Sequence, residues 1–174
     1  TEKDKIFKYT IDNEIKEYVL NNYNSDDILV DCIRMKYGET VPLYHATDVA
    51  SSKIIETEGL KPVEFSNNRT TGDDCIYFQI GSSNYVSDMR PILYKWDCPI
   101  SIIEKYGYVD TDSVYLSDDE LIEMGFDIND IPSESLDFLS YFVANDYTID
   151  GMEIFLANRD NDPNFPKIFP KRIN

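Results

Sequence analysis

Apolar residues recur at helical spacing twice within the first forty residues. A first helix is predicted over residues 13–21. Its apolar face comprises Ile15, Tyr18 and Val19. Ser25 is placed to cap a second helix and Gly38 to end it. The apolar stripe of this second helix comprises Ile28, Leu29, Cys32 and Ile33. The pattern predicts two helices that pack as a lid or flank on the rest of the chain.

Short strands and short helices alternate after this pair. Strands are predicted over residues 43–45, 75–80 and 91–96, where apolar residues run together or alternate with polar ones. Between the first two strands, Asp48 is placed to cap a short helix that Gly59 ends. The inward face of this helix is expected to comprise Val49, Ile54 and Ile55.

The last third of the chain continues in the same way. A strand is predicted over residues 114–116. Ser117 opens a short helix with an acidic first turn, as the helix dipole favours. Ser133 or Ser135 opens a further helix. Its apolar face comprises Leu136, Leu139 and either Phe142 or Val143. The predicted closing strands are residues 152–156 and 167–169.

This order of elements predicts the α+β fold class. We expect a single domain with a split or bent antiparallel β-sheet core, flanked by short helices. Residues 1–40 form an N-terminal helical segment packed on the core, and residues 41–174 form the domain that holds the sheet. The 174 residues are 42% hydrophobic and 13% aromatic, which suits a folded chain with a sizeable core.

Composition also narrows the function classes. No apolar run approaches 18 residues, so no membrane span is expected, and the charged opening TEKDKIFKYT does not resemble a signal peptide. Three widely spaced cysteines fit neither a disulfide framework nor a zinc site, and one histidine makes a structural metal improbable. A reducing, cytoplasmic location of a producing or target cell is the expectation.

The net charge is −17, from 16 basic and 33 acidic residues. Such a field repels phosphate backbones and disfavours direct nucleic-acid binding. The simplest interpretation is a well-solvated surface. The alternative is functional: an acidic face could dock on a basic partner, or imitate nucleic acid and block a protein that binds it.

One histidine and two tyrosines carry the candidate chemistry. His45, the only histidine, ends a predicted strand, where it is either a buried structural residue or a donor to a ligand hydroxyl. Tyr77 lies on the next strand and is either core or pocket. Tyr85 follows Gly81-Ser82-Ser83-Asn84, a segment rich in turn-forming residues. It is either a pocket residue or an exposed aromatic residue in a loop.

The segments around these residues resemble a known family. LYHAT, the helix ending in GLKP, then IYF and SSNY look like the ADP-ribosyltransferase superfamily, in its His-Tyr-Glu (diphtheria-toxin/PARP-like) branch. The resemblance covers about forty-five residues, from Val41 to Tyr85. Ala46 replaces the usual glycine after the histidine. The resemblance implies that the domain at 41–174 is ADP-ribosyltransferase-like.

The resemblance implies that NAD is the co-substrate and that the bond between its ribose and nicotinamide is broken. His45 would hydrogen-bond the adenosine ribose, with Thr47 in support. Tyr77 and Tyr85 would stack on either side of the nicotinamide ring, which orients it at low entropy cost. The loop FSNNRTTGDD would lie near the ligand and bring Arg69 to it.

The family's third element is a glutamate on a late strand, which stabilises positive charge at the reacting ribose. The segment TIDGMEIFLANRD resembles that strand. Glu153 is the first candidate for the acid and Asp160 the second. The alternative for Glu153 is an outward charge on an amphipathic strand. If neither acid reaches the pocket, the domain would bind NAD or ADP-ribose without transferring it.

The expected function is therefore NAD-dependent ADP-ribosyl transfer to a macromolecule, a protein target with a basic surface. RNA 2′-phosphotransferases share the family's opening motif, but they hold RNA with basic residues that this acidic chain lacks. A bacterial or phage effector, toxin or anti-defence protein would suit the size and composition. The alternatives are a non-catalytic acidic inhibitor or DNA mimic, and an NAD or ADP-ribose sensor.

Overall fold

The computed structural model describes residues 1–62, 75–110 and 116–174, with residues 7–9 as helical backbone only. These residues form one six-stranded antiparallel sheet in the order β4-β5-β2-β1-β3-β6. The strands are β1 Thr40–Thr47, β2 Cys75–Ile80, β3 Ile92–Pro99, β4 Gly107–Val109, β5 Glu153–Ala157 and β6 Lys171–Arg172. The helices are α1 Glu2–Asn22, α2 Ile28–Tyr37, α3 Val49–Glu58, α4 Ile100–Tyr106, α5 Asp118–Glu123 and α6 Ser133–Ala144. The predicted α+β class with an antiparallel sheet is confirmed.

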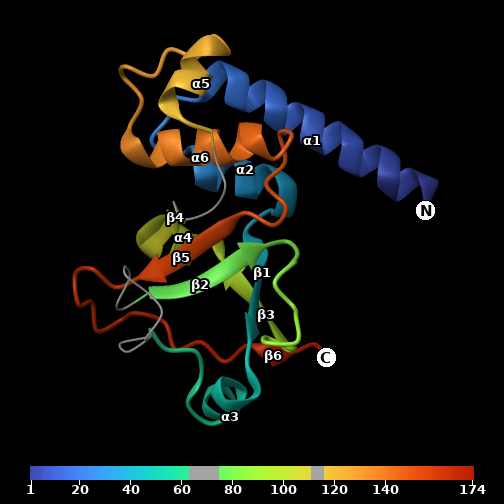
Figure 1. The fold of residues 1–174 in the computed structure, drawn as a ribbon, viewed down its shortest axis with the longest axis vertical. Coiled ribbons are helices and arrows are strands. Elements are labelled where there is room, and N and C mark those ends of the chain that lie inside the picture. Colours follow the sequence, from blue (N-terminus) through green and yellow to red (C-terminus); the bar gives the residue numbers. More distant parts are fainter. Residues whose placement is uncertain (63–74, 111–115) are drawn as a thin grey trace.

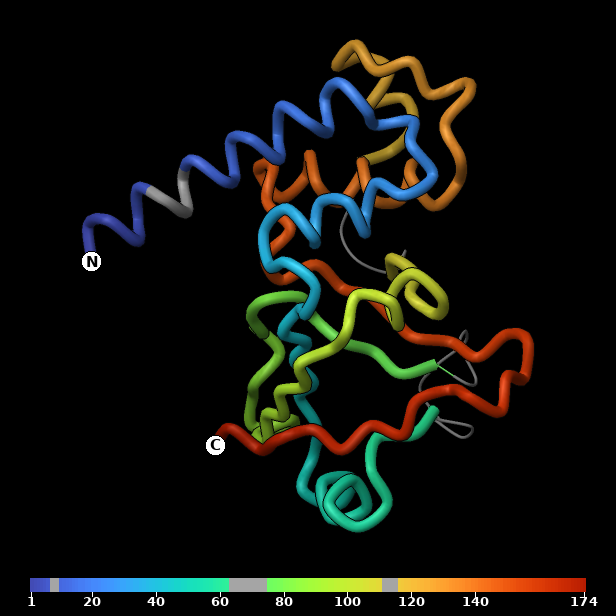
Figure 2. Tube along the Cα trace, turned by 180° about the vertical axis from the view of Figure 1, so that it is seen from behind, coloured from blue at the N-terminus to red at the C-terminus, as the bar shows by residue number. Residues whose placement is uncertain are grey.

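The helices gather at the two ends of the sheet. Figure 1 shows α1, α2, α5 and α6 together at one end and α3 alone at the other. Seen from behind, the first turns of α1 project past the body of the molecule (Figure 2). The sheet therefore lies between a helical layer built from the N-terminal helices and the helices at residues 118–144 and, at its other end, the short α3, while α4 packs beside β3, β4 and β5.

Helix α1 is longer than the predicted helix at 13–21. Its buried stripe is made by Ile15 and Val19, with Tyr18 partly buried, as expected. The extra turns at its N-terminal side include Ile6, which is 63% exposed. An exposed helical turn has no buried apolar face, so periodicity could not locate the first turn of the helix.

The start of α2 differs from the prediction, whereas its end agrees. Asp27, not Ser25, occupies the N-cap position, and the Ser25 hydroxyl instead accepts a hydrogen bond from the Asp27 amide at 3.3 Å. The Ser25 carbonyl accepts the Ser135 hydroxyl at 2.5 Å, which joins this turn to α6. Gly38 ends the helix with a φ of 80°, as predicted.

The inward face of α3 was predicted correctly for Ile55 and wrongly for Val49 and Ile54. Val49 and Ile54 are 53% and 55% exposed, whereas Ser52 and Ile55 are buried. The Ser52 carbonyl accepts the Tyr94 hydroxyl of β3 at 3.3 Å, which joins the helix to the sheet. The Asp48 cap and the Gly59 stop are confirmed.

Two elements were not predicted, and two predicted helices are confirmed. Helix α4 and strand β4 occupy a stretch for which no element was expected. Ser117 caps α5 in a capping box with Glu120, and α6 begins at Ser133. Leu139, Phe142 and Val143 of α6 are all buried, so both alternatives for its inner face hold.

The closing strands shift relative to the prediction. The strand predicted at 152–156 is β5, one residue further along. At 167–169 the structure has a single bridge between Ile168 and Leu60, and the strand that follows is β6. Of the strand predicted at 114–116, Leu116 lies outside any strand and the other two residues lie outside the described part of the chain.

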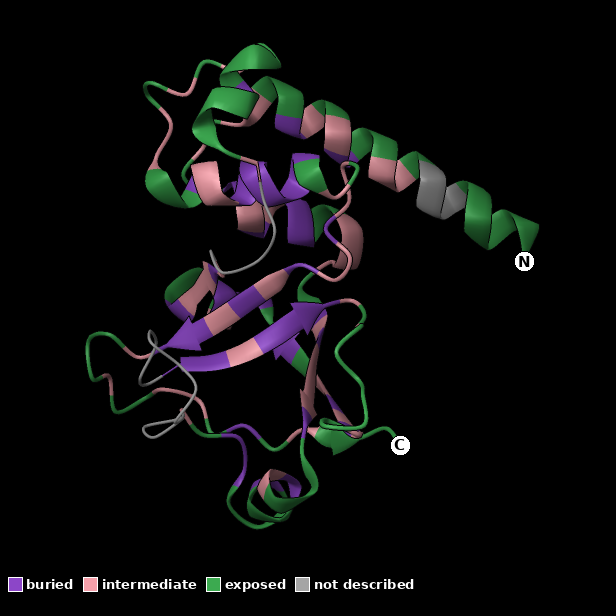
Figure 3. Ribbon diagram, viewed as in Figure 1, coloured by how far each residue is buried: buried purple, intermediate pink, exposed green. Residues whose placement is uncertain are grey.

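The core runs from the helical layer into one face of the sheet. Figure 3 shows the buried residues concentrated on α6, α2 and the central strands. Cys32, Cys75 and Cys98 are buried on three different elements, as expected for thiols. Burial raises the pKa of Cys32 and Cys98 to about 12, so neither is a nucleophile at neutral pH. No helix in the described ranges is long and apolar enough to cross a bilayer.

Candidate functional site

The sheet is closed on one side of β1 and opens on the other. Between β1 and β3 the register runs over eight residue pairs, from Thr40–Pro99 to Thr47–Ile92. Between β1 and β2, both fully described, it covers two pairs, Leu43–Ile80 and Tyr44–Gln79. Figure 1 shows β2 turning away from β1 beyond this point. The split of the sheet thus falls beside the end of β1 that carries His45.

The hydrogen-bond pattern locates the opening to one residue pair. The Gly81 amide donates to the Pro42 carbonyl at 2.9 Å, which defines a hydrogen-bonded pair. Hydrogen-bonded pairs occur at every second residue of an antiparallel ladder. After Pro42–Gly81 the next is Tyr44–Gln79, and the one after that would be Ala46–Tyr77. That pair does not form in the described strands. A sheet that opens in this way can present main-chain groups to a ligand.

His45 reaches across this opening. Its Nδ1 lies 2.7 Å from the Tyr77 carbonyl oxygen. Because a carbonyl can only accept, Nδ1 carries the proton and the lone pair of the neutral ring lies on Nε2. The ring also meets Phe78 edge-on, with centroids 6.0 Å apart. His45 and Tyr77, which are 32 positions apart in the sequence, are thus brought into direct contact.

The Tyr77 side chain lies on the opposite face of β2 from Phe78, in an aromatic row. Its ring centroid is 5.6 Å from that of Phe155, its register partner on β5. Phe155 stacks on Tyr108 of β4 at 5.4 Å. The Arg159 guanidinium lies 3.9 Å from the Tyr108 ring centroid. This row was not predicted, because it depends on the register of three strands.

The register separates the two candidate acids. Glu153 pairs with Gln79, and Phe155 pairs with Tyr77, so Glu153 lies diagonally beside Tyr77 on the same face of the sheet. Such diagonal neighbours are about 7–8 Å apart. Asp160 is exposed and lies beyond the opposite end of β5. Only Glu153 therefore starts from a position beside Tyr77.

Tyr85 lies in the loop at residues 81–91 and is 43% exposed. The loop is tied to the sheet by Gln79, which is 3% exposed. The Gln79 Nε2 donates to Asn84 Oδ1 at 2.8 Å and to the Gly151 carbonyl at 3.0 Å. Its Oε1 accepts the Asn84 amide at 3.1 Å. Because Gln79 and Tyr77 share a face of β2, the loop with Tyr85 returns to the face that carries Tyr77.

A polar junction holds the turn that precedes Glu153. The Lys36 ammonium binds Asp12 at 2.7 Å and Asp150 at 3.0 Å, and the Tyr37 hydroxyl donates to Asp150. Burial and the Asp150 contact raise the pKa of Tyr37, so it remains a donor. Gly81 has a φ of 75°, and a Cβ there would collide with the Tyr37 hydroxyl. The N-terminal helices are thus bonded to the turn and packed against Gly81, the first residue of the loop.

Thr47 and Arg69 are the two other residues predicted to contact NAD, and the structure describes only Thr47. Thr47 is the last residue of β1, pairs with Ile92 and is 8% exposed. Its predicted contact with a ribose remains untested. Arg69 and its loop lie outside the described residues. Within the described ranges no group of three or more His, Cys, Asp or Glu side chains could hold a metal ion.

The arrangement places an aromatic row and a carboxylate on one face of the sheet and the His45 imidazole on the other face, with Phe78, where it bonds the Tyr77 carbonyl at the opening. An aromatic face binds a flat ring, the opened strands offer donors and acceptors, and a carboxylate stabilises a developing cation. Comparisons with protein-family models, with curated proteins and with solved structures found no match for this chain.

Proposed function

We propose that this chain is an NAD-dependent ADP-ribosyltransferase that modifies a macromolecule, a protein with a basic surface. The observation that supports it best is the bond from His45 Nδ1 to the Tyr77 carbonyl at the opening between β1 and β2, with the Glu153 side chain beside that of Tyr77 on the other face of the sheet. They come from three strands, and their neighbourhood does not follow from their spacing in the sequence.

The proposed reaction breaks the bond between the ribose C1′ and the nicotinamide nitrogen. Nicotinamide leaves with the bonding electron pair, and C1′ takes on positive charge. The Glu153 carboxylate holds the ribose hydroxyl and stabilises this charge. A nucleophilic atom of the target then bonds to C1′ and loses its proton. His45 and Thr47 hold the adenosine ribose, and Tyr77 and Tyr85 hold the nicotinamide ring.

The residues present fit NAD as a substrate. The dinucleotide has a flat nicotinamide ring at one end and, in its other half, an adenosine ribose with free hydroxyls. The Tyr77 row offers an aromatic face for the ring. His45, on the other side of the strand opening, offers an imidazole to a hydroxyl. A ligand that passes through the opening from one face of the sheet to the other would contact both.

The test is release of nicotinamide and transfer of label from NAD labelled in its adenosine half. Basic proteins such as histones serve as acceptors. Glu153→Gln keeps the shape of the side chain and is expected to lower the rate about 100-fold or more. Asp160→Asn is the matched control and leaves the rate unchanged. The proposal is overturned if the wild type neither releases nicotinamide nor transfers label, or if Glu153→Gln behaves as wild type.

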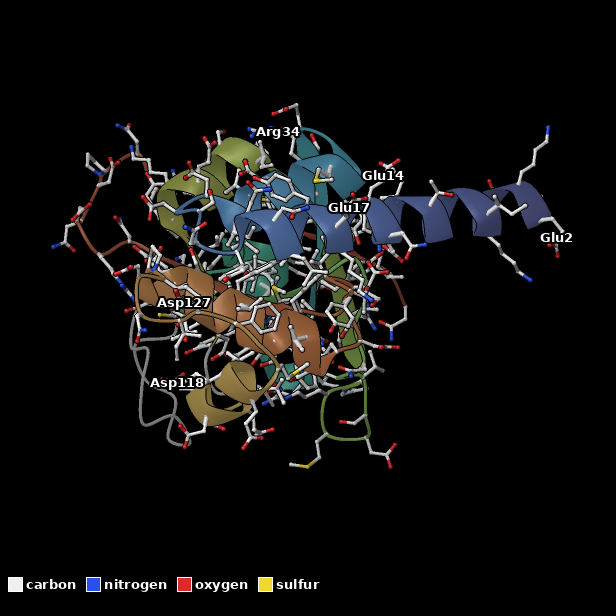
Figure 4. All side chains as sticks on the ribbon, turned by 90° about the horizontal axis from the view of Figure 1, so that it is seen from above. Glu2, Glu14, Glu17, Arg34, Asp118 and Asp127 are labelled. Atoms are coloured by element: carbon white, nitrogen blue, oxygen red, sulfur yellow. The ribbon has the colours of Figure 1, made fainter. Side chains whose placement is uncertain are left out.

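A second candidate is favoured by the charge distribution. Residues 106–158 contain no lysine or arginine. Figure 4 shows Asp118 and Asp127 at one side of the helical layer and Glu2, Glu14 and Glu17 along α1. All five are exposed. A non-catalytic acidic inhibitor would bind a basic groove with this surface. Its binding would weaken steeply with salt and would survive His45→Ala and Tyr77→Ala.

A further inference from the structure

We propose that Gln79 is a positioning residue that fixes Tyr85 relative to Glu153. This inference rests on the proposed function, since it assigns a role within the same reaction. Gln79 lies between the two parts to be aligned: its register partner on β5 is Glu153, and its side chain binds the loop of Tyr85.

Both the nitrogen and the oxygen of the Gln79 carboxamide form hydrogen bonds. Both Nε2 hydrogens are donated, one to Asn84 Oδ1 and one to the Gly151 carbonyl, and Oε1 accepts the Asn84 amide. The partners fix its orientation, because an amide can only donate and a carbonyl can only accept. Only a side-chain amide of this length satisfies all three partners at once. The carboxylate of a glutamate would place an acceptor against two acceptors.

Each bond has a separate consequence. The bonds to Asn84 hold the residue next to Tyr85. The bond to Gly151 holds the turn two residues before Glu153, and the Gly151 amide in turn donates to the Ile80 carbonyl at 2.7 Å. A single buried side chain thus joins the ring that would cover the nicotinamide to the strand that carries the acid. Misplacement of reacting groups by about 1 Å can cost about 100-fold in rate.

The first arm of the test does not depend on catalysis. Hydrogen exchange of the Asn84 amide is compared in the wild type, Gln79→Met and Ser87→Ala. Ser87 lies in the same loop and bonds Arg90, so Ser87→Ala is the matched control. Exchange is expected to rise about tenfold or more in Gln79→Met, because its acceptor is lost, and to stay unchanged in Ser87→Ala. Unchanged exchange in Gln79→Met overturns the proposal.

The second arm is a double-mutant cycle on nicotinamide release. Gln79→Met is expected to lower kcat/KM about 100-fold. Adding Tyr85→Ala should then cost little more, because the ring is already displaced. If Tyr85→Ala costs the same factor in both backgrounds, Gln79 does not act through Tyr85 and the proposal fails. Asn84→Ala keeps Gln79 and its bond to Gly151, so it replaces Gln79→Met in the cycle if that variant does not fold.

The two arms separate the failures. If the wild type shows no NAD cleavage, the proposed function fails and the positioning role fails with it, whatever the exchange shows. If the wild type is active but the exchange or the cycle shows no coupling, only the role of Gln79 is wrong.

Discussion

The two long edges of β1 differ in construction, although one strand carries both. Toward β3, eight register pairs close the edge, and Leu43 and Tyr94 beside it are 0% and 1% exposed. Toward β2, the ladder stops after two pairs, and His45 fills the opening with a side-chain bond. The difference separates two tasks: burial along the closed edge stabilises the fold, and the open edge carries the candidate chemistry.

The largest expected effect on stability comes from breaking the closed edge. Leu43→Ala removes a fully buried side chain from the centre of the sheet and is expected to lower the free energy of unfolding by about 2–5 kcal/mol. Urea unfolding followed by circular dichroism measures it. Ile173, which is 49% exposed, provides the control: Ile173→Ala should stay within about 0.5 kcal/mol of wild type. A loss below about 1 kcal/mol in Leu43→Ala would contradict the assignment.

The next largest effect on stability is expected at the polar junction of Lys36 with Asp12 and Asp150. Lys36→Met leaves the partly buried Asp12 and Asp150 carboxylates without their ammonium partner. We expect a loss of about 1–3 kcal/mol, below the cost for a fully buried pair because both acids keep some contact with water. Lys95→Met is the control, since its pair with Asp97 is exposed and should contribute less than about 0.5 kcal/mol. Equal effects of the two substitutions in urea unfolding would refute a structural role for the junction.

A matched pair of residues compares the two edges directly. His45 and Tyr94 are register partners on β1 and β3. His45→Phe loses the bond to the Tyr77 carbonyl, and Tyr94→Phe loses hydroxyl contacts to Ser52 and Glu56. Each is expected to cost about 1 kcal/mol of stability. Under the proposed function, nicotinamide release falls at least tenfold in His45→Phe only. Parallel losses of activity in both variants would show that the edges are not functionally distinct.

The smallest effect is a pH dependence away from both edges. The Lys105 ammonium, the Asn164 amide and the Tyr106 hydroxyl lower the pKa of Asp162 from 3.8 to about 2. Because the folded pKa is the lower one, this stabilisation is present above the ordinary pKa and is lost as the pH falls from about 4 to 2. The melting temperature of wild type should therefore fall more than that of Asp162→Asn between pH 5 and 2.5. Parallel curves would show that Asp162 contributes nothing.

The sequence predicted those elements whose pattern repeats within a few residues. The strand expected at 75–80 is β2 with the same bounds, and the Asp48 cap and the Gly38 and Gly59 stops all hold. Helix α4 was missed because its isoleucines are β-branched, which favours strands, and packing of Ile100 and Ile103 overrides that preference. The stripe of α3 was only partly right, because Ser52 is buried beside Ile55 whereas Val49 and Ile54 are exposed.

The candidate site divides in the same way. Residue type and motif predict His45, Tyr77 and Glu153, whereas their relative positions depend on strand register. Gln79 was missed, because its role depends on partners on both the loop and the turn, one of them 72 positions away. A glutamine in an apolar strand could have served as a signal, since a buried amide requires partners.

The sequence by itself determined most of the helices and strands, where several of them stop, and which rare side chains are candidates for chemistry. Each of these depends on the spacing of residues within a few positions, because the side-chain periods of helices and strands are short. Only the tertiary structure decided that β1 is closed on one edge and open on the other, and that Glu153 rather than Asp160 lies beside Tyr77. These depend on strand register, which is set by contacts between residues far apart in the chain.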